Sequence, residues 1–435
     1  MNYKLISFFV PLLLIFNVSI VPLMVNGASS NIKAAPYYMP LDNDPQNIDD
    51  IVANSGIRHF IFAFVLATTD GQCIPTWDGL KSQRVEDDRK VLEMIGKVRS
   101  HGGDVSISFG GYNGVELGHV CRSPEQLASA YQLVIDKYGL THVDFDIEGD
   151  DLGAVDEELK RFHAIKILKH NAQTKGRQLH VTLTMPCTTV GLSELGKAEI
   201  KRAISVQQDL IDLYKIMAFD YGGPGGSMSD SVIQIMEMIH QQIGSLRTDL
   251  NVEQIYEHMG IILMNGHTDQ PSEMFTLDTF EHVMNYARTK HYGRLSYWSL
   301  NRDRPCPSGK NFGWAAGTCS SIVQTPWQFT KIIAKFVSND DVRTERPETS
   351  TITRSPTTTT TTSANPTTNR IPQTVDCTNT HGEQYFPYNG DCHKYIRCYE
   401  GVAHIEQCPS GLLYDLQLHV CNWEHDVNRP ECFQH

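Results

Sequence analysis

The stretch THVDFDIEGDD, residues 141–151, places a carboxylate at every second position, with bulky apolar residues between them. A period of two is typical of a β-strand, because successive side chains point to opposite faces of the sheet. The carboxylates are Asp144, Asp146 and Glu148, and we call them the acidic ladder. Like charges so close together repel one another and raise the pKa of at least one carboxyl group. Folding alone gives no reason for this pattern.

Three interpretations fit the acidic ladder. The simplest is a solvent-exposed acidic edge strand. The second is an EF-hand calcium loop, but its twelfth position falls on Val155, where a bidentate glutamate is required. The third is a set of carboxylates for acid–base chemistry, in which the neighbours keep one group protonated. The rest of the chain must decide between them.

Length, composition and charge set limits on the class of protein. The chain has 435 residues, 40% of them hydrophobic and 20% charged, and a formal net charge of −13. This length predicts one large domain with additions. The negative charge argues against a nucleic-acid partner and is compatible with a neutral polysaccharide. We expect a monomer.

Residues 1–27 are expected to be a secretory signal peptide. Lys4 precedes a long apolar run, and small residues follow at a suitable distance for cleavage. A tilted signal anchor is the alternative, but Asn17 and Pro22 interrupt the run. We therefore expect an extracellular protein with no membrane attachment after cleavage. In that environment most of the 11 cysteines should form disulfides.

Three segments follow the signal peptide. Residues 341–374 include TSTITRSPTTTTTTSANPTTNR, which has no apolar pattern to offset the entropy cost of ordering. Such a composition is typical of an extended, O-glycosylated linker. The linker separates a large region, residues 28–340, from a tail, residues 375–435.

The large region alternates strand-like and helix-like stretches. The strand-like stretches are 35–39, 60–65, 104–109, 143–148, 180–185, 214–219, 260–264 and 294–300. Helical spacing occurs near 89–98, 124–139, 156–174, 229–243 and 278–290, and from 325 onward. Eight such units in about 300 residues predict an α/β fold, the (β/α)8 or TIM barrel. A doubly wound open sheet is the alternative, but no Gly-rich phosphate loop follows the first strand. Catalytic groups of such a barrel lie at the carboxyl ends of strands, which places the acidic ladder at the barrel mouth.

Several motifs, which follow one another along the chain in the order of the family, resemble the family 18 glycoside hydrolases, the chitinases. The acidic ladder resembles the Asp-x-Asp-x-Glu signature, SFGG (108–111) the Ser-x-Gly-Gly motif, and MAFDY (217–221) the Met-x-Tyr-Asp motif. Trp298 matches the tryptophan that forms the floor of the cleavage subsite. The stretches LSYWSLNRDRPC and NGHTDQPSEMFTL are similar to a bacterial-type branch. The resemblance covers residues 33–338 and implies a chitinase acting on chitin or N-acetylglucosamine oligomers. We expect no metal and no cofactor.

The resemblance implies substrate-assisted catalysis with retention of the anomeric configuration, in which the acetamido oxygen of the sugar is the nucleophile. Glu148 would protonate the glycosidic oxygen and later activate water. Asp146 would hold the acetamido N–H, and Asp144 would tune Asp146 and share a proton with it. Asp220 and Tyr221 would position the acetamido group. Further substrate contacts are implied for Met217, Trp298, Gly110 and Gly111.

Two places depart from the family pattern. Thr141 and His142 stand where the family often has Asp-Gly, deep in the strand, and we expect little effect. Phe219 stands where the third motif usually has a tyrosine that donates a hydrogen bond to the substrate, and phenylalanine cannot donate one. Tyr221 is the candidate to supply the hydroxyl instead.

The tail is small and rich in cysteine. So short a segment needs covalent cross-links, and the spacing alone leaves the pairing open. The absence of a Cys-x2-Cys pair argues against zinc. The frame GEQYFPYNGDCHKYIRC resembles a peritrophin-A chitin-binding domain, which implies the pairs Cys377–Cys398, Cys392–Cys432 and Cys408–Cys421. Tyr395, Tyr414 and Trp423 are candidates for stacking on sugar rings, although some of them must form the small core.

Five cysteines lie in the barrel region. We expect the disulfides Cys306–Cys319 and Cys73–Cys121, with Cys187 left as a free thiol.

Residues 265–277, after the seventh strand, number only 13, which is too short for an inserted domain. We therefore expect an open cleft and cutting at internal bonds. Three alternatives to a chitinase remain: a catalytically weak or inactive chitin-binding lectin, an endo-β-N-acetylglucosaminidase acting on glycoproteins, and a structural cuticle or gut-lining protein. The presence of Glu148 disfavours the first, the tail disfavours the second, and the complete acidic ladder disfavours the third.

Overall fold

The computed structural model describes the barrel region almost completely and the tail in part. The described residues are 32–222, 227–270, 272–307, 315–337, 377, 384–388, 391–399, 402–408, 412–415 and 420–423. The predicted signal peptide and linker therefore lie outside the described residues. Within the described part, every helix is too short or too polar to cross a membrane.

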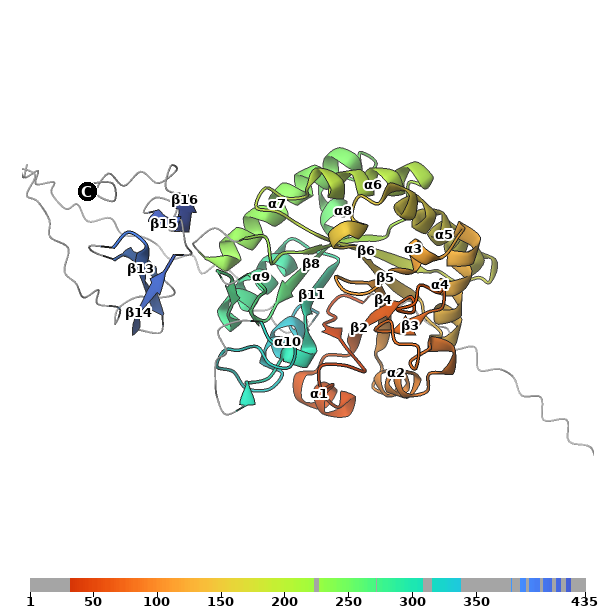
Figure 1. Cartoon of the computed structure of the whole chain (residues 1–435), viewed down its shortest axis with the longest axis horizontal. Helices are drawn as coiled ribbons and strands as arrows, with labels where there is room; N and C mark the ends of the chain where they lie inside the picture. Colours follow the sequence, from red (N-terminus) through yellow and green to blue (C-terminus); the bar gives the residue numbers. More distant parts are fainter. Residues whose placement is uncertain are drawn as a thin grey trace, which may run out of the picture. The chain divides into compact units, whose positions relative to one another are not determined.

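Eight parallel strands form a barrel in the described part of the chain, and they neighbour one another in chain order (Figure 1). The strands are β1 Tyr37–Tyr38, β2 His59–Leu66, β4 Asp104–Gly110, β5 His142–Asp146, β6 His180–Pro186, β7 Leu213–Met217, β8 Met259–Met264 and β11 Arg294–Trp298. The ring closes where Ala34, just before β1, pairs with Leu295 of β11. The predicted (β/α)8 barrel is confirmed, and the open sheet is wrong because the first and last strands meet.

Helices surround the barrel (Figure 1). They are α1 Ile48–Ser55, α2 Lys90–Ser100, α3 Leu117–Val120, α4 Pro124–Tyr138, α5 Val155–Thr174, α6 Glu194–Val206, α7 Met228–Leu246, α8 Val252–Glu257, α9 Leu277–Thr289 and α10 Gln328–Ala334. The sequence periodicity does not single out α1, α6 and α8. Each of these follows a capping side chain that accepts a hydrogen bond from the first turn, namely Asn47, Ser193 and Asn251.

Strand β5 explains the period of two in the acidic ladder. It pairs with β4 on one side and with β6 on the other, so the edge-strand interpretation is wrong. Its apolar face packs outward, where the Phe145 ring lies 5.1 Å from the Tyr131 ring of α4. Asp144 and Asp146 point the other way, into the barrel. The EF-hand interpretation is also wrong, because Val155 begins helix α5.

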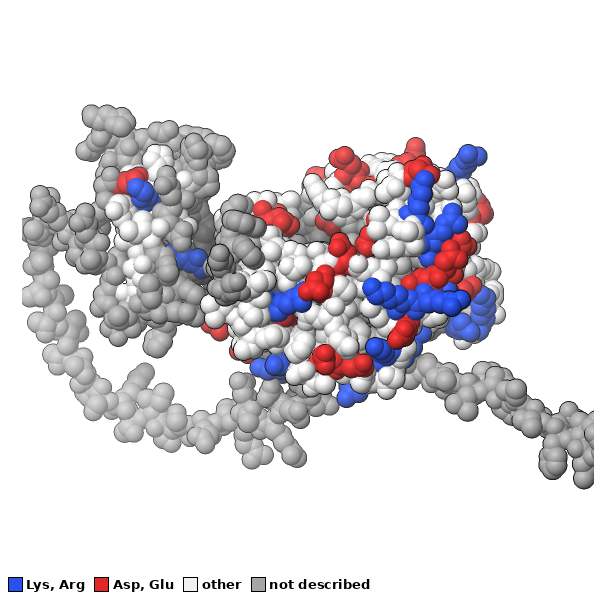
Figure 2. Space-filling view, turned by 60° about the horizontal axis from the view of Figure 1, so that its bottom comes forward, with Lys and Arg blue, Asp and Glu red and all other residues white. Residues whose placement is uncertain are grey.

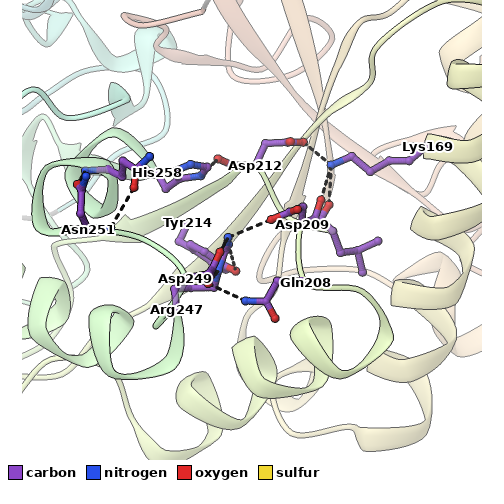
Figure 3. Close-up of polar contacts among 11 residues, drawn as sticks. Lys169, Gln208, Asp209, Asp212, Tyr214, Arg247, Asp249, Asn251 and His258 are labelled. Carbon is purple, nitrogen blue, oxygen red and sulfur yellow. Dashed lines mark hydrogen bonds and ion pairs between the residues drawn. The ribbon is translucent and has the colours of Figure 1, made fainter.

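A polar network at the amino ends of the strands fastens the helix layer to the barrel (Figure 3). Arg247, which follows α7, lies 2.8 Å from Asp249 and 3.2 Å from Asp209. Lys169 of α5 lies 2.8 Å from Asp212, which precedes β7. These contacts are at the opposite end of the barrel from the acidic ladder, so they hold the scaffold and leave the mouth free.

Disulfides join loops in the barrel region. Cys73, after β2, is bonded to Cys121, which follows α3, and Cys306 is bonded to Cys319. Cys187 is a buried free thiol. On the face of the molecule in Figure 2, acidic and basic side chains lie interspersed among uncharged ones.

The described residues of the tail form two small antiparallel sheets. The first consists of β12 Gln384–Pro387, β13 Lys394–Tyr399 and β14 Val402–Gln407, and the second of β15 Leu412–Asp415 and β16 Val420–Trp423. Tyr395 stacks on Tyr414 with the ring centroids 4.8 Å apart, and Tyr414 is buried. This pair therefore contributes to the core of the tail. The side chain of Trp423 lies outside the described residues.

The tail also contains cross-links. Cys377 and Cys398 form a disulfide. Cys392 and Cys408 each take part in a disulfide as well. Their predicted partners are Cys432 and Cys421, but Cys432 and the side chain of Cys421 lie outside the described residues. The tail therefore has the cross-links that a core of this size requires.

Candidate active site

A cavity of about 810 Å³ lies at the carboxyl ends of the barrel strands. Predicted site residues that line it are Asp146, Glu148, Met217, Asp220 and Trp298. The sequence analysis did not single out other residues of its lining, which include Tyr37, Asp78, Tyr112, Asp269 and Gln270. The described lining does not include Asp144, Gly110, Gly111 or Tyr221. The fold thus brings residues from Tyr37 to Trp298, far apart in the sequence, around one cavity.

Glu148 follows the end of β5 and is partly buried in the cavity wall. Burial raises the pKa of its carboxyl group to about 7, and the negative charges of Asp220, Asp269 and Asp151 add to the rise. A backbone hydrogen bond from Tyr112 acts in the opposite direction. A carboxyl group with a pKa near neutral can both donate and accept a proton at physiological pH, as a general acid and base requires.

Asp146 lies deeper, as the last residue of β5. Burial raises the pKa of Asp146 well above the usual range, and the charges of Glu148 and Asp144 raise it further. Its Oδ1 atom is buried without a hydrogen-bond partner among the described residues, and the side chain lines the cavity. A buried polar atom of this kind is costly unless something binds it, so Oδ1 is placed to accept a hydrogen bond from a ligand.

Gly110 and Gly111 shape the backbone around Asp146. The N–H of Gly111 donates to the carbonyl oxygen of Asp146 at 2.9 Å. Both glycines have positive φ values, +102° and +88°. A β-carbon on Gly111 would lie 2.8 Å from the ring of Phe64, which itself lines the cavity. In this structure the two glycines allow strands β4 and β5 and the Phe64 ring to approach closely.

Asp144 lies beneath Asp146 and has no exposed surface. It accepts hydrogen bonds from the hydroxyl groups of Tyr37, Ser108 and Thr184, each at 2.8 Å. Lys215 of β7 lies 3.1 Å from its Oδ1 atom. The sequence signal for this contact is a lysine inside the otherwise apolar strand LYKIM, which the sequence analysis overlooked.

Asp220 is held by the loop that follows β8. Its backbone is left-handed, with φ at 56°, and its N–H donates to the Glu273 carboxylate at 2.7 Å. Its Oδ1 atom accepts the N–H of Gln270 at 3.1 Å. Burial raises the pKa of Asp220, and Asp269 adds to the rise, while Thr268 opposes it.

The loop after β8 is a small hairpin, formed by β9 Gly266–His267 and β10 Met274–Phe275. The hairpin contains Glu273 and Gln270, so the short segment supports the active site.

Tyr221 lies elsewhere. Its hydroxyl group is buried without a hydrogen-bond partner among the described residues. Burial raises the pKa of Tyr221, and the negative charge of Glu273 adds to the rise. The neighbouring Phe219 does line the cavity. The position that resembles the family tyrosine therefore faces the cavity without a hydroxyl group.

Trp298 and Phe64 form an aromatic floor. Their rings stack with centroids 5.5 Å apart and an interplanar angle of 19°, and Tyr37 meets Trp298 edge-on at 5.8 Å. Tyr112 stands at the rim with 76% of its surface exposed. Flat aromatic faces of this kind can pack against the apolar faces of sugar rings. Among the described residues, there is no cluster of three His, Cys, Asp or Glu side chains that could hold a metal ion.

A parallel barrel with protonatable carboxyl groups above an aromatic floor has the arrangement of a glycoside hydrolase. Known proteins similar to this chain specify the class. Over 314 residues the chain is 26% identical to a probable bifunctional chitinase/lysozyme of Escherichia coli K12, covering 69% of this chain and 34% of that protein. Over 283 residues it is 26% identical to Endochitinase 11 of Metarhizium anisopliae, covering 62% of this chain and 52% of that protein. The chain thus spans about a third and about half of these two relatives.

Solved structures and a family model agree with this class. Active domain 2 of a chitinase from Pyrococcus furiosus aligns with a TM-score of 0.62 and 26% identity, over 70% of this chain and 95% of that one. The same domain has been solved with chito-oligosaccharides. Residues 377–432 match the Chitin binding Peritrophin-A domain. The predicted resemblance is confirmed: the barrel is similar in sequence and structure to chitinases, and the tail matches a peritrophin-A domain.

Proposed function

We propose that this protein is a secreted chitinase that cuts internal β-1,4 bonds of chitin with retention of the anomeric configuration. The observation that carries the proposal is the pair of carboxyl groups of Glu148 and Asp146, both with raised pKa values, in one cavity above Trp298. Disulfides in the barrel and the tail support an oxidising, extracellular location.

In the proposed reaction Glu148 donates its proton to the glycosidic oxygen as the bond to the anomeric carbon breaks. The acetamido oxygen of the same sugar attacks that carbon and forms an oxazolinium ion, so no protein carboxylate acts as the nucleophile. Asp146 accepts the acetamido N–H and stabilises the positive charge. Its unpartnered Oδ1 atom supports this role. Glu148 then takes a proton from water as the water oxygen attacks the anomeric carbon. The bond between that carbon and the acetamido oxygen breaks, so the acetamido group is restored and the configuration is retained.

The test is hydrolysis of N-acetylglucosamine oligomers with analysis of the products, using Glu148→Gln as the matched variant. The amide keeps the shape of the side chain but cannot deliver a proton, so we expect a loss of about 10²–10⁴-fold or more in kcat with binding retained. NMR of the first products should show the β-anomer. Most of the activity surviving in Glu148→Gln, or an α-anomer as the first product, would contradict the proposal.

Internal cutting is supported by the short hairpin after β8, which leaves no room for an inserted domain to wall the cleft. An open groove admits a chain from the side. The expected result on long soluble chitosan of intermediate acetylation is a rapid fall in viscosity with oligomers of mixed length. Dimers released from the outset with little change in viscosity would point to cutting from chain ends.

The peritrophin-A domain is proposed to anchor the enzyme on insoluble chitin. A tether raises the local concentration of the barrel at the surface without changing the active site. A chain ending at residue 340 should therefore lose activity on solid chitin and keep it on soluble oligomers. Equal loss on both substrates would show that the tail acts in another way.

One observation favours a second candidate, a weakly active or inactive chitin-binding lectin. Phe219 faces the cavity at the place where the resemblance implies a hydrogen-bonding tyrosine. Calorimetric binding of oligomers without any turnover would support the lectin and reject the enzyme.

A further inference from the structure

Beneath the proposed catalytic carboxyl groups lies a lysine, Lys215, with no exposed surface. Its Nζ atom is 3.1 Å from Oδ1 of Asp144 and 4.3 Å from the centre of the Tyr37 ring. The first distance is short enough for an ion pair, although Nζ is not aligned for a hydrogen bond. A buried ammonium group is costly unless a partner compensates its charge. The barrel therefore contains a charge pair that folding alone does not require.

The barrel makes room for this lysine. Lys215 pairs in register with Gly260 of β8, and a β-carbon there would lie 3.1 Å from Cγ of Lys215 and 3.3 Å from Cβ of Arg294. Glycine at this place lets two cationic side chains from flanking strands share the barrel interior. Arg294 is itself held by the Thr182 hydroxyl at 3.0 Å and the carbonyl oxygen of Ile32 at 2.7 Å.

Asp144 is surrounded by donors on both oxygens. Oδ2 accepts from Tyr37 and Ser108, and Oδ1 accepts from Thr184 and faces Lys215. Together these contacts hold the carboxyl group of Asp144 in one orientation. The surroundings are those of a carboxylate anion that is fixed in position.

We propose that Lys215 is a positioning residue, which fixes Asp144 in place beneath Asp146 and contributes the positive charge that acts on Asp146. This inference rests on the proposed function and deepens it. The protonation of Asp146 then depends on two charges that are fixed in position, those of Asp144 and Lys215. In the proposed reaction Asp146 must be ionised to stabilise the positive charge. Lys215 therefore influences the pH below which activity is lost.

The charged and titratable groups around Lys215 are few. Those that influence it are Asp144, Arg294 and Asp146, and Tyr37 lies over it. On Asp146, burial, Glu148 and Asp144 raise the pKa, and Lys215 lowers it. Three histidines near the amino ends of the strands also face Arg294, and burial lowers the pKa of each: His59, His142 and His180. They are therefore neutral at neutral pH, and Lys215 and Arg294 supply the positive charge of the barrel interior.

The test is the pH profile of kcat/KM on soluble oligomers for Lys215→Met, which keeps the length of the side chain and removes its charge. Loss of the cation should move the acid limb of the profile up by about 1–3 pH units, and kcat should fall more than KM changes. Lys169→Met is the matched control, because Lys169 forms an ion pair with Asp212 at the far end of the barrel. Its acid limb should stay in place. A folded Lys215→Met protein with an unchanged acid limb would overturn the inference.

Two further variants keep the inference testable if Lys215→Met does not fold. Asp144→Asn leaves the Lys215 charge unopposed, so its acid limb should move to lower pH. Asp144→Asn combined with Lys215→Met removes both charges, so its limb should return toward that of the wild type. Profiles that coincide for these two variants would reject the role of Lys215.

Failure of the proposed function is separable from failure of this inference. If the wild type does not hydrolyse oligomers, the function fails. The inference is then measured by the pH titration of the Asp146 carboxyl carbon resonance in ¹³C-labelled protein. The titration midpoint should rise in Lys215→Met, and an unchanged midpoint would reject the inference independently of any activity.

Discussion

Gly110 lies so close to Asp146 that a β-carbon on Gly110 would stand 2.1 Å from the carbonyl oxygen of Asp146. The two residues are partners in the register of β4 and β5. The recessed carboxyl group of the cavity therefore keeps its place because the neighbouring strand has no side chain there. This relationship gives the SFGG motif a physical reason that does not require contact with substrate.

Replacing Gly110 by alanine should destabilise the barrel and reduce activity. The methyl group would clash with backbone and the φ of +102° would be strained, which together should cost at least about 2 kcal/mol in the free energy of unfolding. Gly56→Ala is the control, because Gly56 has a φ of +77° but an open site, and it should cost about 1 kcal/mol. Urea unfolding measures both, and equal costs would show that the close approach is unimportant.

Activity should fall as the pH rises through about 7, because Glu148 has its pKa raised to about 7 and must be protonated to act as an acid. Asp269 contributes to that rise, so Asp269→Asn should move the alkaline limb of the kcat/KM profile to lower pH. Asp136→Asn, on the outer helix α4, serves as the control and should leave the limb in place. An alkaline limb that stays in place in Asp269→Asn would mean that Asp269 does not contribute to the pKa of Glu148.

Phe219→Tyr should increase the turnover of oligomers. Phe219 lines the cavity beside Asp220, so a hydroxyl group there could donate a hydrogen bond to the acetamido group. One such bond contributes about 1–1.5 kcal/mol, or about tenfold in kcat. Tyr221→Phe should change kcat little, because the Tyr221 hydroxyl is not part of the described cavity lining. A large loss in Tyr221→Phe would restore Tyr221 as the hydroxyl donor.

Arg247→Met should lower stability without affecting the active site. Arg247 has 1% of its side chain exposed and binds Asp249 and Asp209 (Figure 3). Hydrogen bonds to charged groups contribute about 1.5–3 kcal/mol, and the exposure of both aspartates reduces this, so we expect a loss of about 1–2 kcal/mol. Lys175→Met breaks an exposed ion pair with Asp136 at 3.8 Å and should have almost no effect. Thermal unfolding of both variants, together with kcat, provides the measurement.

The architecture was largely predictable because its signals are local. The alternation of eight strand-like and helix-like stretches predicts the barrel, and the order of the motifs predicts which strand ends meet. Helices α1 and α6 were not predicted, although the capping residues Asn47 and Ser193 are local signals for them.

The positions of individual site residues were predicted less evenly. Asp146, Glu148, Asp220 and Trp298 line the cavity because each stands at or just past the end of a barrel strand. Tyr221 was expected beside them, but it follows a left-handed residue, Asp220, and it is not part of the described cavity lining. Aspartate adopts the left-handed conformation more often than most residues other than glycine, but an aspartate in the sequence does not by itself mark such a turn.

The sequence by itself determined the class of fold, the acidic ladder and the cysteine-rich tail, because periodicity and motif spacing are properties of neighbouring residues. Only the tertiary structure decided that Lys215 lies against Asp144, that Glu273 holds the Asp220 backbone, and that Gly110 admits Asp146. These contacts join different strands and loops, so they depend on barrel register and closure. Register is a property of how all the strands pack together, and it sets the charges that surround each carboxyl group.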